Sequence, residues 1–475
     1  MKRICLAIFG VAGLLVFLSA GCSLDFPSNP KINVNQPTGK PAAQNYVAIG
    51  NSLTAGFMDS GLHVQGQTNS IASLIANRIG YNVLPDPNAN FTQPWINEPG
   101  IGSNAAGSDS VATTLYWNGT TITYDAYPES EAQDLLLGAS LTTPYDNLGV
   151  PGAWVHDVST RLTKTTSTGG AVPEPLYNPF FDFILRNPSF GNVTMQGQAA
   201  GKGPSLVTLW IGNNDVLGGA TSGNPVDGVN ITPASTFEQL YGQLLETIDR
   251  DITARFGYHP TIVLANIPSV TAVPFFIPWA FWSTLPLPQV TYEEDPNNDG
   301  LIASVLFTAL GLMQTTPPDT LGSEYTLTNT EAALVSSRIG EYNTIIANLA
   351  DQRGLEVVDV YTLLNDLPQE QKTHFWVLVE VQDMPPVQAA LTTYFSLDGI
   401  HPNNQGYAYV ANAFIVAINA ALGLQGSDGY GPINAPISNW DPTYGRNGGG
   451  PVTQNKDMRF PSRSTTEQMS AIFRH

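Results

Sequence analysis

Cysteine is almost absent from this chain of 475 residues, since Cys5 and Cys22 are the only two and both lie near the N-terminus. The rest of the sequence has no disulfide to stabilise it, so a folded domain has to rely on a hydrophobic core of ordinary size. Charged residues are also scarce, at 12% of the chain, whereas glycine (44) and proline (36) are plentiful. This composition indicates a loop-rich domain rather than a small disulfide-stabilised scaffold.

Basic residues are few: 19 lysines and arginines stand against 39 aspartates and glutamates, which gives a formal net charge of −20. An acidic surface repels nucleic acid and anionic lipid head groups. We therefore expect no nucleic-acid partner and no membrane binding through a basic patch. Long apolar runs are missing too, because the most apolar stretch after the N-terminus, residues 273–282, is short and contains two prolines. That stretch is not a transmembrane helix.

The N-terminus has the pattern of an export signal. A basic pair, Lys2 and Arg3, precedes an apolar run at residues 4–19, and small residues lead to Cys22. A basic start, an apolar centre and a small-residue cleavage site are typical of secretory signals. The run is shorter than the roughly 20 residues that span a bilayer. We therefore predict that residues 1–21 are a signal peptide that is removed.

The residues up to Cys22 resemble a bacterial lipoprotein signal, in which the cysteine is acylated, although Ser19 stands where an aliphatic residue is usual. Lipid on Cys22 would then be the protein's attachment to a membrane. Because Ser23 replaces the aspartate that often retains lipoproteins in the inner membrane, we expect an exported bacterial outer-membrane lipoprotein. The alternative is an ordinary signal cleaved near Ala20, with Cys22 as a free thiol.

Composition divides the mature chain into three parts. Residues 22–43 are rich in Pro, Asn and Lys and are interpreted as a tether. Residues 44–425 carry the apolar patterns of one domain, interrupted at 82–142 and 268–325 by stretches that we interpret as long insertions. The Gly/Pro/Asn-rich tail, residues 426–475, is expected to wrap around the surface or to be partly disordered.

Short apolar segments alternate with amphipathic ones within the domain. We predict buried strands at residues 46–49, 205–211, 261–265 and 355–360, and helices at 71–79, 237–256, 331–355 and 405–422. This alternation predicts an α/β fold with a central parallel sheet.

Ser52 follows the first predicted strand within the block Gly-Asn-Ser-Leu-Thr (50–54). A serine at a strand-to-helix turn lies at the carboxyl edge of the sheet, where open α/β folds bind ligands. An ordinary turn or helix N-cap would also account for these residues. The block is not the G-x-S-x-G elbow, because Thr54 stands in place of the second glycine.

Asp398 precedes His401 by three residues in the block Asp-Gly-Ile-His-Pro. A carboxylate at this spacing can orient one imidazole nitrogen while the other faces a hydroxyl. None of the other five histidines has Asp or Glu three residues earlier. His259 is also followed by proline, but Phe256 precedes it by three, which favours a structural role.

Two further blocks could supply donors to an oxyanion. Asn214 follows the predicted strand 205–211, where its amide could donate a hydrogen bond, and the neighbouring Asn213 is expected to point elsewhere. Gly152 closes the block at residues 147–152, where glycine lets the backbone approach a substrate. Taken alone, each block also fits an ordinary turn.

In this order the four blocks resemble those of the SGNH/GDSL hydrolase family. The usual G-D-S has Asn51 instead of aspartate here, whereas the others match N-x-G-x-x-G, G-x-N-D and D-x-x-H-P. The resemblance implies a three-layer α/β/α, flavodoxin-like fold. It also implies an esterase- or lipase-type serine hydrolase that works through an acyl-enzyme and needs no cofactor or metal.

By position, the resemblance makes Ser52 the nucleophile, His401 the general base and Asp398 the residue that orients it. The oxyanion hole would comprise the backbone N–H groups of Ser52 and Gly152 and the side chain of Asn214.

The substrate stays open at this point: the apolar residues 273–282 and 301–313 suit a lipid ester, whereas the Asn, Thr, Trp and Tyr residues of 82–142 suit a sugar ester. A carbohydrate deacetylase of the same family and a non-catalytic binding lipoprotein are the alternatives. We expect a monomer. Residues 295–300 begin like a calcium loop, but Leu306 replaces the glutamate at the twelfth position, which favours a solvated turn.

Overall fold

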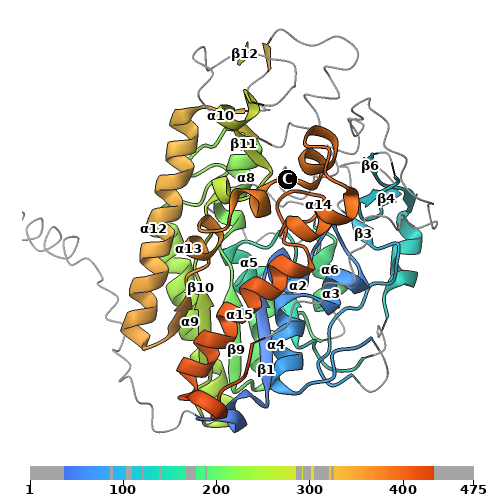
Figure 1. The fold of residues 1–475 in the computed structure, drawn as a ribbon. Helices are drawn as coiled ribbons and strands as arrows, with labels where there is room; N and C mark the ends of the chain where they lie inside the picture. The colour runs from blue at the N-terminus through green and yellow to red at the C-terminus, as the bar shows by residue number, and fades with distance from the viewer. Residues whose placement is uncertain are drawn as a thin grey trace, which may run out of the picture.

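Five parallel strands form the centre of the molecule (Figure 1). The computed structural model describes residues 37–85, 89–102, 110–119, 121–137, 141–165, 178–187, 190–284, 291–292, 301–303, 320–321 and 326–432. The central strands are β1 (Tyr46–Gly50), β8 (Asn147–Gly149), β9 (Leu206–Trp210), β10 (Thr261–Ala265) and β16 (Glu356–Val358).

The strands lie in the order β16-β10-β9-β1-β8, and every neighbouring pair is parallel. Counted along the chain, this is the 2-1-3-4-5 order of flavodoxin-like sheets. The chain therefore winds toward opposite edges from a switch point between β1 and β9. Open α/β sheets bind their ligands outside the carboxyl ends of the strands at such a point.

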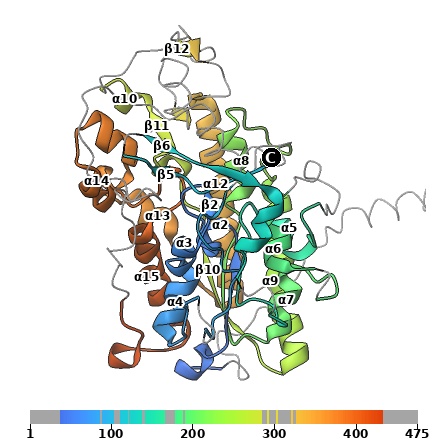
Figure 2. The same cartoon turned by 90° about the vertical axis from the view of Figure 1, so that its right-hand side faces the viewer.

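Helices cover both faces of the sheet. Their bounds are α4 (Ile71–Ile79), α5 (Val155–Thr160), α7 (Met195–Lys202), α9 (Ala234–Phe256), α12 (Asn329–Arg353) and α15 (Asn404–Ala421). In Figure 2, α4 and α15 lie on one side of the strands, and α5, α7 and α9 lie on the other, where α12 packs against α9. Every residue of β1, β9 and β10 is buried between these layers. The expected three-layer α/β/α fold with a central parallel sheet is confirmed.

The predicted helices and strands agree closely with the structure, and their ends follow local signals. Ser70 caps α4 by accepting a hydrogen bond from Ser73 N, and Gly80 ends that helix in the left-handed conformation. A capping box between Thr328 and Glu331 begins α12. One strand was missed: β8 has only three residues, too few to show a period, and the sequence analysis interprets it as part of a turn.

Short helices begin at the carboxyl ends of the strands, and they position the residues discussed below. They are α2 (Ser52–Ala55) after β1, α8 (Asn214–Thr221) after β9 and α13 (Val360–Asn365) after β16. Because all five strands are parallel, these helix starts meet at one edge of the sheet.

The segment between α4 and β8 contains three small antiparallel pairs, β2 with β3, β4 with β7 and β5 with β6. The elements from α2 to α7 outside the core layers are β2 (Gly61–Leu62), α3 (Val64–Thr68), β3 (Ile101–Gly102), β4 (Ser110–Ala112), β5 (Tyr116–Trp117), β6 (Ile122–Thr123), β7 (Ala126–Pro128), η2 (Glu129–Leu135) and α6 (Phe180–Leu185).

The segment after β10 pairs β11 with β13, β13 with β15, and β12 with β14. Its elements are η3 (Val270–Ala272), β11 (Phe276–Pro278), α10 (Trp279–Trp282), β12 (Thr291–Tyr292), β13 (Leu301–Ala303), β14 (Thr320–Leu321) and β15 (Thr326–Leu327). Between α13 and α15 the chain forms η5 (Gln369–Lys372), a π-helical turn η6 (Val377–Val381) and α14 (Pro386–Thr392).

The domain begins earlier than expected. Residues 40–43, which the sequence analysis assigns to the tether, form the short helix η1 (Lys40–Ala43), and Ala42 and Ala43 are fully buried in the core. Gly39 N also donates to Leu422 O at 3.0 Å. The polar composition of the segment hides these two alanines, whose small apolar side chains belong to the hydrophobic core.

At the other end, η7 (Gly426–Asp428) follows α15, and the backbone of Tyr430 exchanges two hydrogen bonds with the Asn419 side chain. The predicted signal peptide, Cys22, most of the tail and the calcium-like residues 295–300 lie outside the described residues. None of the helices described by the structure is both long and apolar enough to cross a membrane.

Candidate active site

Ser52 is presented at the carboxyl end of β1 by a turn that local side chains hold. Asn51 is the N-cap of α2, and its Oδ1 accepts a hydrogen bond from Leu53 N at 3.1 Å. The position before it requires glycine, because a Cβ on Gly50 would overlap the Thr54 hydroxyl and the Trp210 carbonyl oxygen. The Ser52 hydroxyl therefore stands at the start of a helix rather than in solvent, and the residue is 3% exposed.

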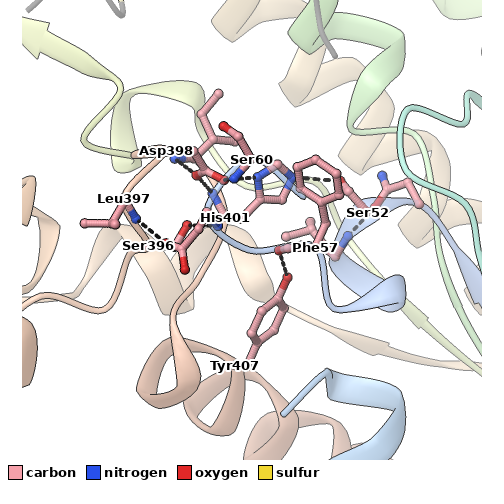
Figure 3. Close-up of polar contacts among 12 residues, drawn as sticks. Ser52, Phe57, Ser60, Ser396, Leu397, Asp398, His401 and Tyr407 are labelled. Carbon is pink, nitrogen blue, oxygen red and sulfur yellow. Dashed lines mark hydrogen bonds and ion pairs between the residues drawn. The ribbon is translucent and has the colours of Figure 1, made fainter. Parts of the chain in front are cut away.

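His401 links Ser52 to Asp398 (Figure 3). His401 Nε2 lies 2.9 Å from Ser52 Oγ, and His401 Nδ1 lies 2.9 Å from Asp398 Oδ2. An ionised carboxylate can only accept, so Nδ1 carries the proton and Nε2 is left to accept from the serine hydroxyl. Asp398 and His401 are each 1% exposed, so water competes little for these hydrogen bonds.

The loop before α15 brings the carboxylate of Asp398 and the imidazole of His401 together. Asp398 Oδ1 accepts from Ile400 N at 2.9 Å and from His401 N at 2.8 Å. Gly399 between them has a φ of 73°, the left-handed region that favours glycine. The spacing of three residues therefore forms a tight turn that aims the carboxylate at the ring of His401.

A second segment of the chain, which carries no recognisable motif, holds this loop. Ser60 N donates to Asp398 Oδ2 at 2.9 Å, and Asp59 Oδ1 accepts from Leu397 N at 2.8 Å. Asp59 and Ser60 both have positive φ angles, 55° and 57°, which are uncommon for residues other than glycine. Nothing in the local sequence indicates these contacts, because the two segments are separated by 338 residues.

The surroundings of Asp398 keep it ionised. Burial by itself would raise the pKa of Asp398, but the neighbouring His401 and the hydrogen bonds from His401 and Ser60 outweigh it and hold that pKa below its ordinary value of 3.8. The ring of Phe57 lies 4.8 Å from that of His401, centroid to centroid. Tyr407, on α15, fixes this segment by donating from its hydroxyl to Phe57 O at 2.5 Å (Figure 3).

Three potential donors to an oxyanion come from the ends of three neighbouring strands. Ser52 follows β1, Gly152 lies just after β8, and Asn214 is the first residue of α8, after β9. In the described part of the chain, neither Ser52 N nor Gly152 N has a hydrogen-bond acceptor. Gly152 has a φ of 77°. The Asn214 amide uses one of its two protons on Ala153 O, at 2.8 Å, which leaves the other available.

Asn213 lies at the site, although it is expected from the sequence to point elsewhere. It lines the same pocket as Asn214, Ser52 and His401. Its Oδ1 accepts a hydrogen bond from Asn51 Nδ2 at 3.2 Å. Asn213 is the N-cap of α8, and Asn214 is its first residue.

Asp215, the last residue of the G-x-N-D block, ties two of these strand ends together. Its carboxylate accepts from Val155 N at 2.9 Å and from Thr232 Oγ1 at 2.8 Å. Burial raises the pKa of Asp215 to about 7, against the opposing effect of these hydrogen bonds. The residue holds the start of α5, and with it the turn that contains Gly152. Its place in the sequence block gives no indication of this role.

A pocket opens beside Ser52, and its empty volume, with the solvent at its mouth included, is about 590 Å³. Apart from Ser52, His401, Ser269 and the two asparagines, its lining is apolar. The apolar residues include Trp210, Val216, Leu217, Ile267, Val270, Val273, Leu364, Phe395 and Ile400. Of the apolar stretch 273–282, Val273 reaches this lining; residues 304–313 lie outside the described part of the chain.

Two other histidines, one paired with a carboxylate and one buried, do not contact Ser52. His259 Nδ1 lies 2.8 Å from Oδ1 of Asp249, a residue of α9. This histidine therefore has a carboxylate partner that is not three residues before it in the sequence. His374 is buried beside the loop of Asp398. Its Nδ1 accepts from Trp376 N at 3.1 Å, and its Nε2 lies 3.0 Å from Leu397 O, as expected for a neutral imidazole that donates to this carbonyl.

The sequence matches the model of a protein family described as GDSL-like lipase/acylhydrolase over residues 46–414. This range includes all four blocks. No protein of curated function matches the chain. Among solved structures, the chain is similar to LAE5, described as an alpha/beta hydrolase enzyme from the metagenome of Lake Arreo, Spain. That likeness has 14% sequence identity and a TM-score of 0.34, and covers 81% of this chain and 98% of the other.

Proposed function

The chain belongs to the GDSL-like lipase/acylhydrolase family, a family of hydrolases that act on esters or acyl groups, and from this premise we propose that it is a serine ester hydrolase. One observation carries the proposal: a buried chain of hydrogen bonds runs from Ser52 Oγ through His401 to Asp398. This arrangement activates a hydroxyl by placing a general base beside it and a carboxylate behind the base.

The reaction proceeds in two acyl-transfer steps. His401 Nε2 takes the proton of Ser52 Oγ as the oxygen attacks the ester carbonyl carbon. The N–H groups of Ser52 and Gly152 and the free amide proton of Asn214 stabilise the resulting oxyanion. His401 then gives its proton to the leaving alkoxy oxygen, which departs as the alcohol. Water attacks the acyl-enzyme with His401 again as base, the acyl–Oγ bond breaks, His401 returns its proton to Ser52 Oγ, and the acid is released.

Asp398 stays ionised throughout this cycle. Its low pKa keeps a negative charge beside the imidazolium that forms when His401 holds the serine proton. The Ser60 and Ile400 N–H groups, which also donate to Asp398, fix the carboxylate in the orientation that selects the Nδ1–H tautomer of His401.

The apolar pocket supports a carboxylic ester with an apolar acyl or alkyl group, rather than an acetylated sugar, as the substrate. A sugar ring needs many hydrogen-bonding partners, and most of the lining side chains have none to offer. A protein that only binds ligands would gain nothing from a serine hydroxyl aligned on an imidazole nitrogen, so the enzyme hypothesis is preferred to the non-catalytic one.

Export and anchoring are a separate part of the proposal, which rests on the lipoprotein-like signal. We propose that Cys22 carries lipid and attaches the enzyme to the bacterial outer membrane. Cells that express the protein with labelled palmitate should yield labelled wild-type protein in the detergent phase. The Cys22→Ser variant should be unlabelled. A soluble, unlabelled wild-type protein would contradict the anchor without affecting the hydrolase proposal.

The catalytic proposal is tested with p-nitrophenyl acetate and butyrate and with a fluorophosphonate probe. Wild-type protein should hydrolyse at least the butyrate and become labelled on Ser52. Ser52→Ala should neither hydrolyse the esters nor become labelled, and it should retain the circular dichroism spectrum and melting temperature of the wild type. Ser60→Ala serves as the matched control, because Ser60 contacts the triad through its backbone N–H and should keep its labelling. Probe attached to a serine other than Ser52 would overturn the assignment.

A further inference from the structure

The Asn51 and Asn213 amides form a pair whose orientation is determined by hydrogen bonding. Asn51 Oδ1 accepts from Leu53 N, which assigns the oxygen to that side of the amide. Asn51 Nδ2 is therefore the atom that faces Asn213, and it lies 3.2 Å from Asn213 Oδ1. An amide presents its oxygen and its nitrogen on opposite sides, so the Asn213 Nδ2 group is turned away from Asn51.

The Asn213 Nδ2 group has no hydrogen-bond acceptor among the described residues. Asn213 is 7% exposed, and it is one of the residues that line the pocket together with Ser52 and His401. A donor in a nearly buried, mostly apolar pocket is costly unless something accepts its hydrogen bond. The Asn213 Nδ2 group is therefore a donor at the pocket that is not used by the hydrogen bond to Asn51.

We propose that Asn213 is a second side-chain donor to the ester group of the substrate, and that Asn51 sets its orientation. The inference rests on the proposed function, because it names a contact in the same reaction. Ester oxygens accept hydrogen bonds and donate none, so they match an amide that presents N–H to the pocket. Asn51 lies next to Ser52 in the chain, which places the pair beside the reacting atoms.

The residue at position 51 decides which atom of Asn213 reaches the pocket. An aspartate there, as in the G-D-S block that the first motif resembles, would still cap α2 by accepting from Leu53 N. Its other oxygen would face Asn213 and would require a donor. The Asn213 amide would then turn over, direct Nδ2 toward position 51 and present Oδ1 to the ester. Asn51 therefore makes Asn213 a donor in this chain.

The experiment is a double-mutant cycle with Asn51→Asp, Asn213→Ala and the combined variant, measured with p-nitrophenyl butyrate. Loss of one neutral hydrogen bond of about 1–1.4 kcal/mol lowers kcat/KM about fivefold to tenfold. Asn213→Ala and Asn51→Asp should each show a loss of this size or larger. The combined variant should be no slower than Asn213→Ala within about a factor of two, because the aspartate acts through an amide that is no longer present.

Stability separates this role from a merely structural one. Asn51→Asp retains the cap of α2, so its melting temperature should stay close to that of the wild type while kcat/KM falls. If the two losses multiply in the combined variant, the new charge rather than the orientation of Asn213 causes the effect at position 51, and the inference is overturned. Wild-type activity in Asn213→Ala would overturn it as well.

The outcome also distinguishes this inference from the proposed function. If the wild-type protein hydrolyses no ester and binds no fluorophosphonate, the serine hydrolase proposal fails. If the wild type is active, Ser52→Ala is inactive and Asn213→Ala matches the wild type, the hydrolase proposal stands and only the role of Asn213 is refuted.

Discussion

Replacing Asp398 with asparagine tests how the carboxylate determines which nitrogen of His401 carries the proton. In the wild type, Oδ1 accepts from Ile400 N and His401 N, and Oδ2 accepts from Ser60 N and His401 Nδ1. An asparagine has one oxygen, so its amide group can replace only one of these two acceptors. The two possible orientations of the amide differ in the number of N–H groups that they leave without an acceptor.

With the amide oxygen toward Ile400 and His401 N, Ser60 N loses its acceptor, and the Nδ2 group faces the imidazole. His401 adapts to this by moving its proton from Nδ1 to Nε2. In the opposite orientation both Ile400 N and His401 N lose their acceptor, and no tautomer change can help. Each buried N–H without an acceptor costs about 1–3 kcal/mol. The first orientation is therefore favoured by roughly this amount, and it is the one with the wrong tautomer.

In the wrong tautomer Nε2 carries a proton and donates to Ser52 Oγ, so it can no longer remove the serine proton. We expect Asp398→Asn to lower kcat by about 10⁴, the order found for the equivalent change in a serine protease triad. The free energy of unfolding should fall by about 1–3 kcal/mol, because the N–H of Ser60 is left without an acceptor. The assays are ester hydrolysis and urea denaturation. Asp249→Asn, at the His259 pair, is the matched control and should keep full activity. A variant at Asp398 that retains a tenth of the wild-type rate would refute the tautomer argument.

Three further outcomes follow from the structure. Asn214→Ala should lower kcat about 10²–10³-fold with little change in KM, because its amide acts mainly when charge develops on the oxyanion; an unchanged kcat would remove it from the oxyanion hole. Burial lowers the pKa of His374 to about 4 from 6.5. The buried neutral imidazole therefore contributes fully to the free energy of unfolding above pH 6.5, and this contribution is lost as the pH falls toward 4. Between pH 6.5 and 4, the free energy of unfolding should fall by about 3 kcal/mol more in the wild type than in His374→Asn. Leu217→Trp fills the apolar pocket and should reduce the rate ratio of p-nitrophenyl octanoate to acetate, whereas Val226→Trp, in an exposed loop, should leave this ratio unchanged.

The order of helices and strands could be predicted from the sequence because their signals are local. The buried strands Thr261–Ala265 and Tyr46–Gly50 are short apolar runs, and the ends of α4 and α12 are marked by capping residues. Strand β8 escaped prediction because three residues show no periodicity, and what makes it a strand is its pairing with β1 across the sheet.

Part of the candidate site is equally local. Asp398 and His401 are three residues apart, so a single turn through Gly399 brings carboxylate and imidazole together, and the sequence pattern contains that geometry. The position of Ser52 after a strand likewise follows from the adjacent Gly50 and Asn51. These residues could be chosen from the sequence because the contacts that define them span a few positions.

Only the tertiary structure decided the rest, because the remaining contacts join residues that are distant in sequence. Ser52 and His401 are 349 positions apart, and the parallel sheet with α15 packed on it brings them within 2.9 Å. The hold of Asp59 and Ser60 on the Asp398 loop depends on positive φ angles that no residue type there demands. The direction of the Asn213 amide depends on Asn51, 162 residues away, since hydrogen bonding between two side chains is decided by which atoms the fold places face to face.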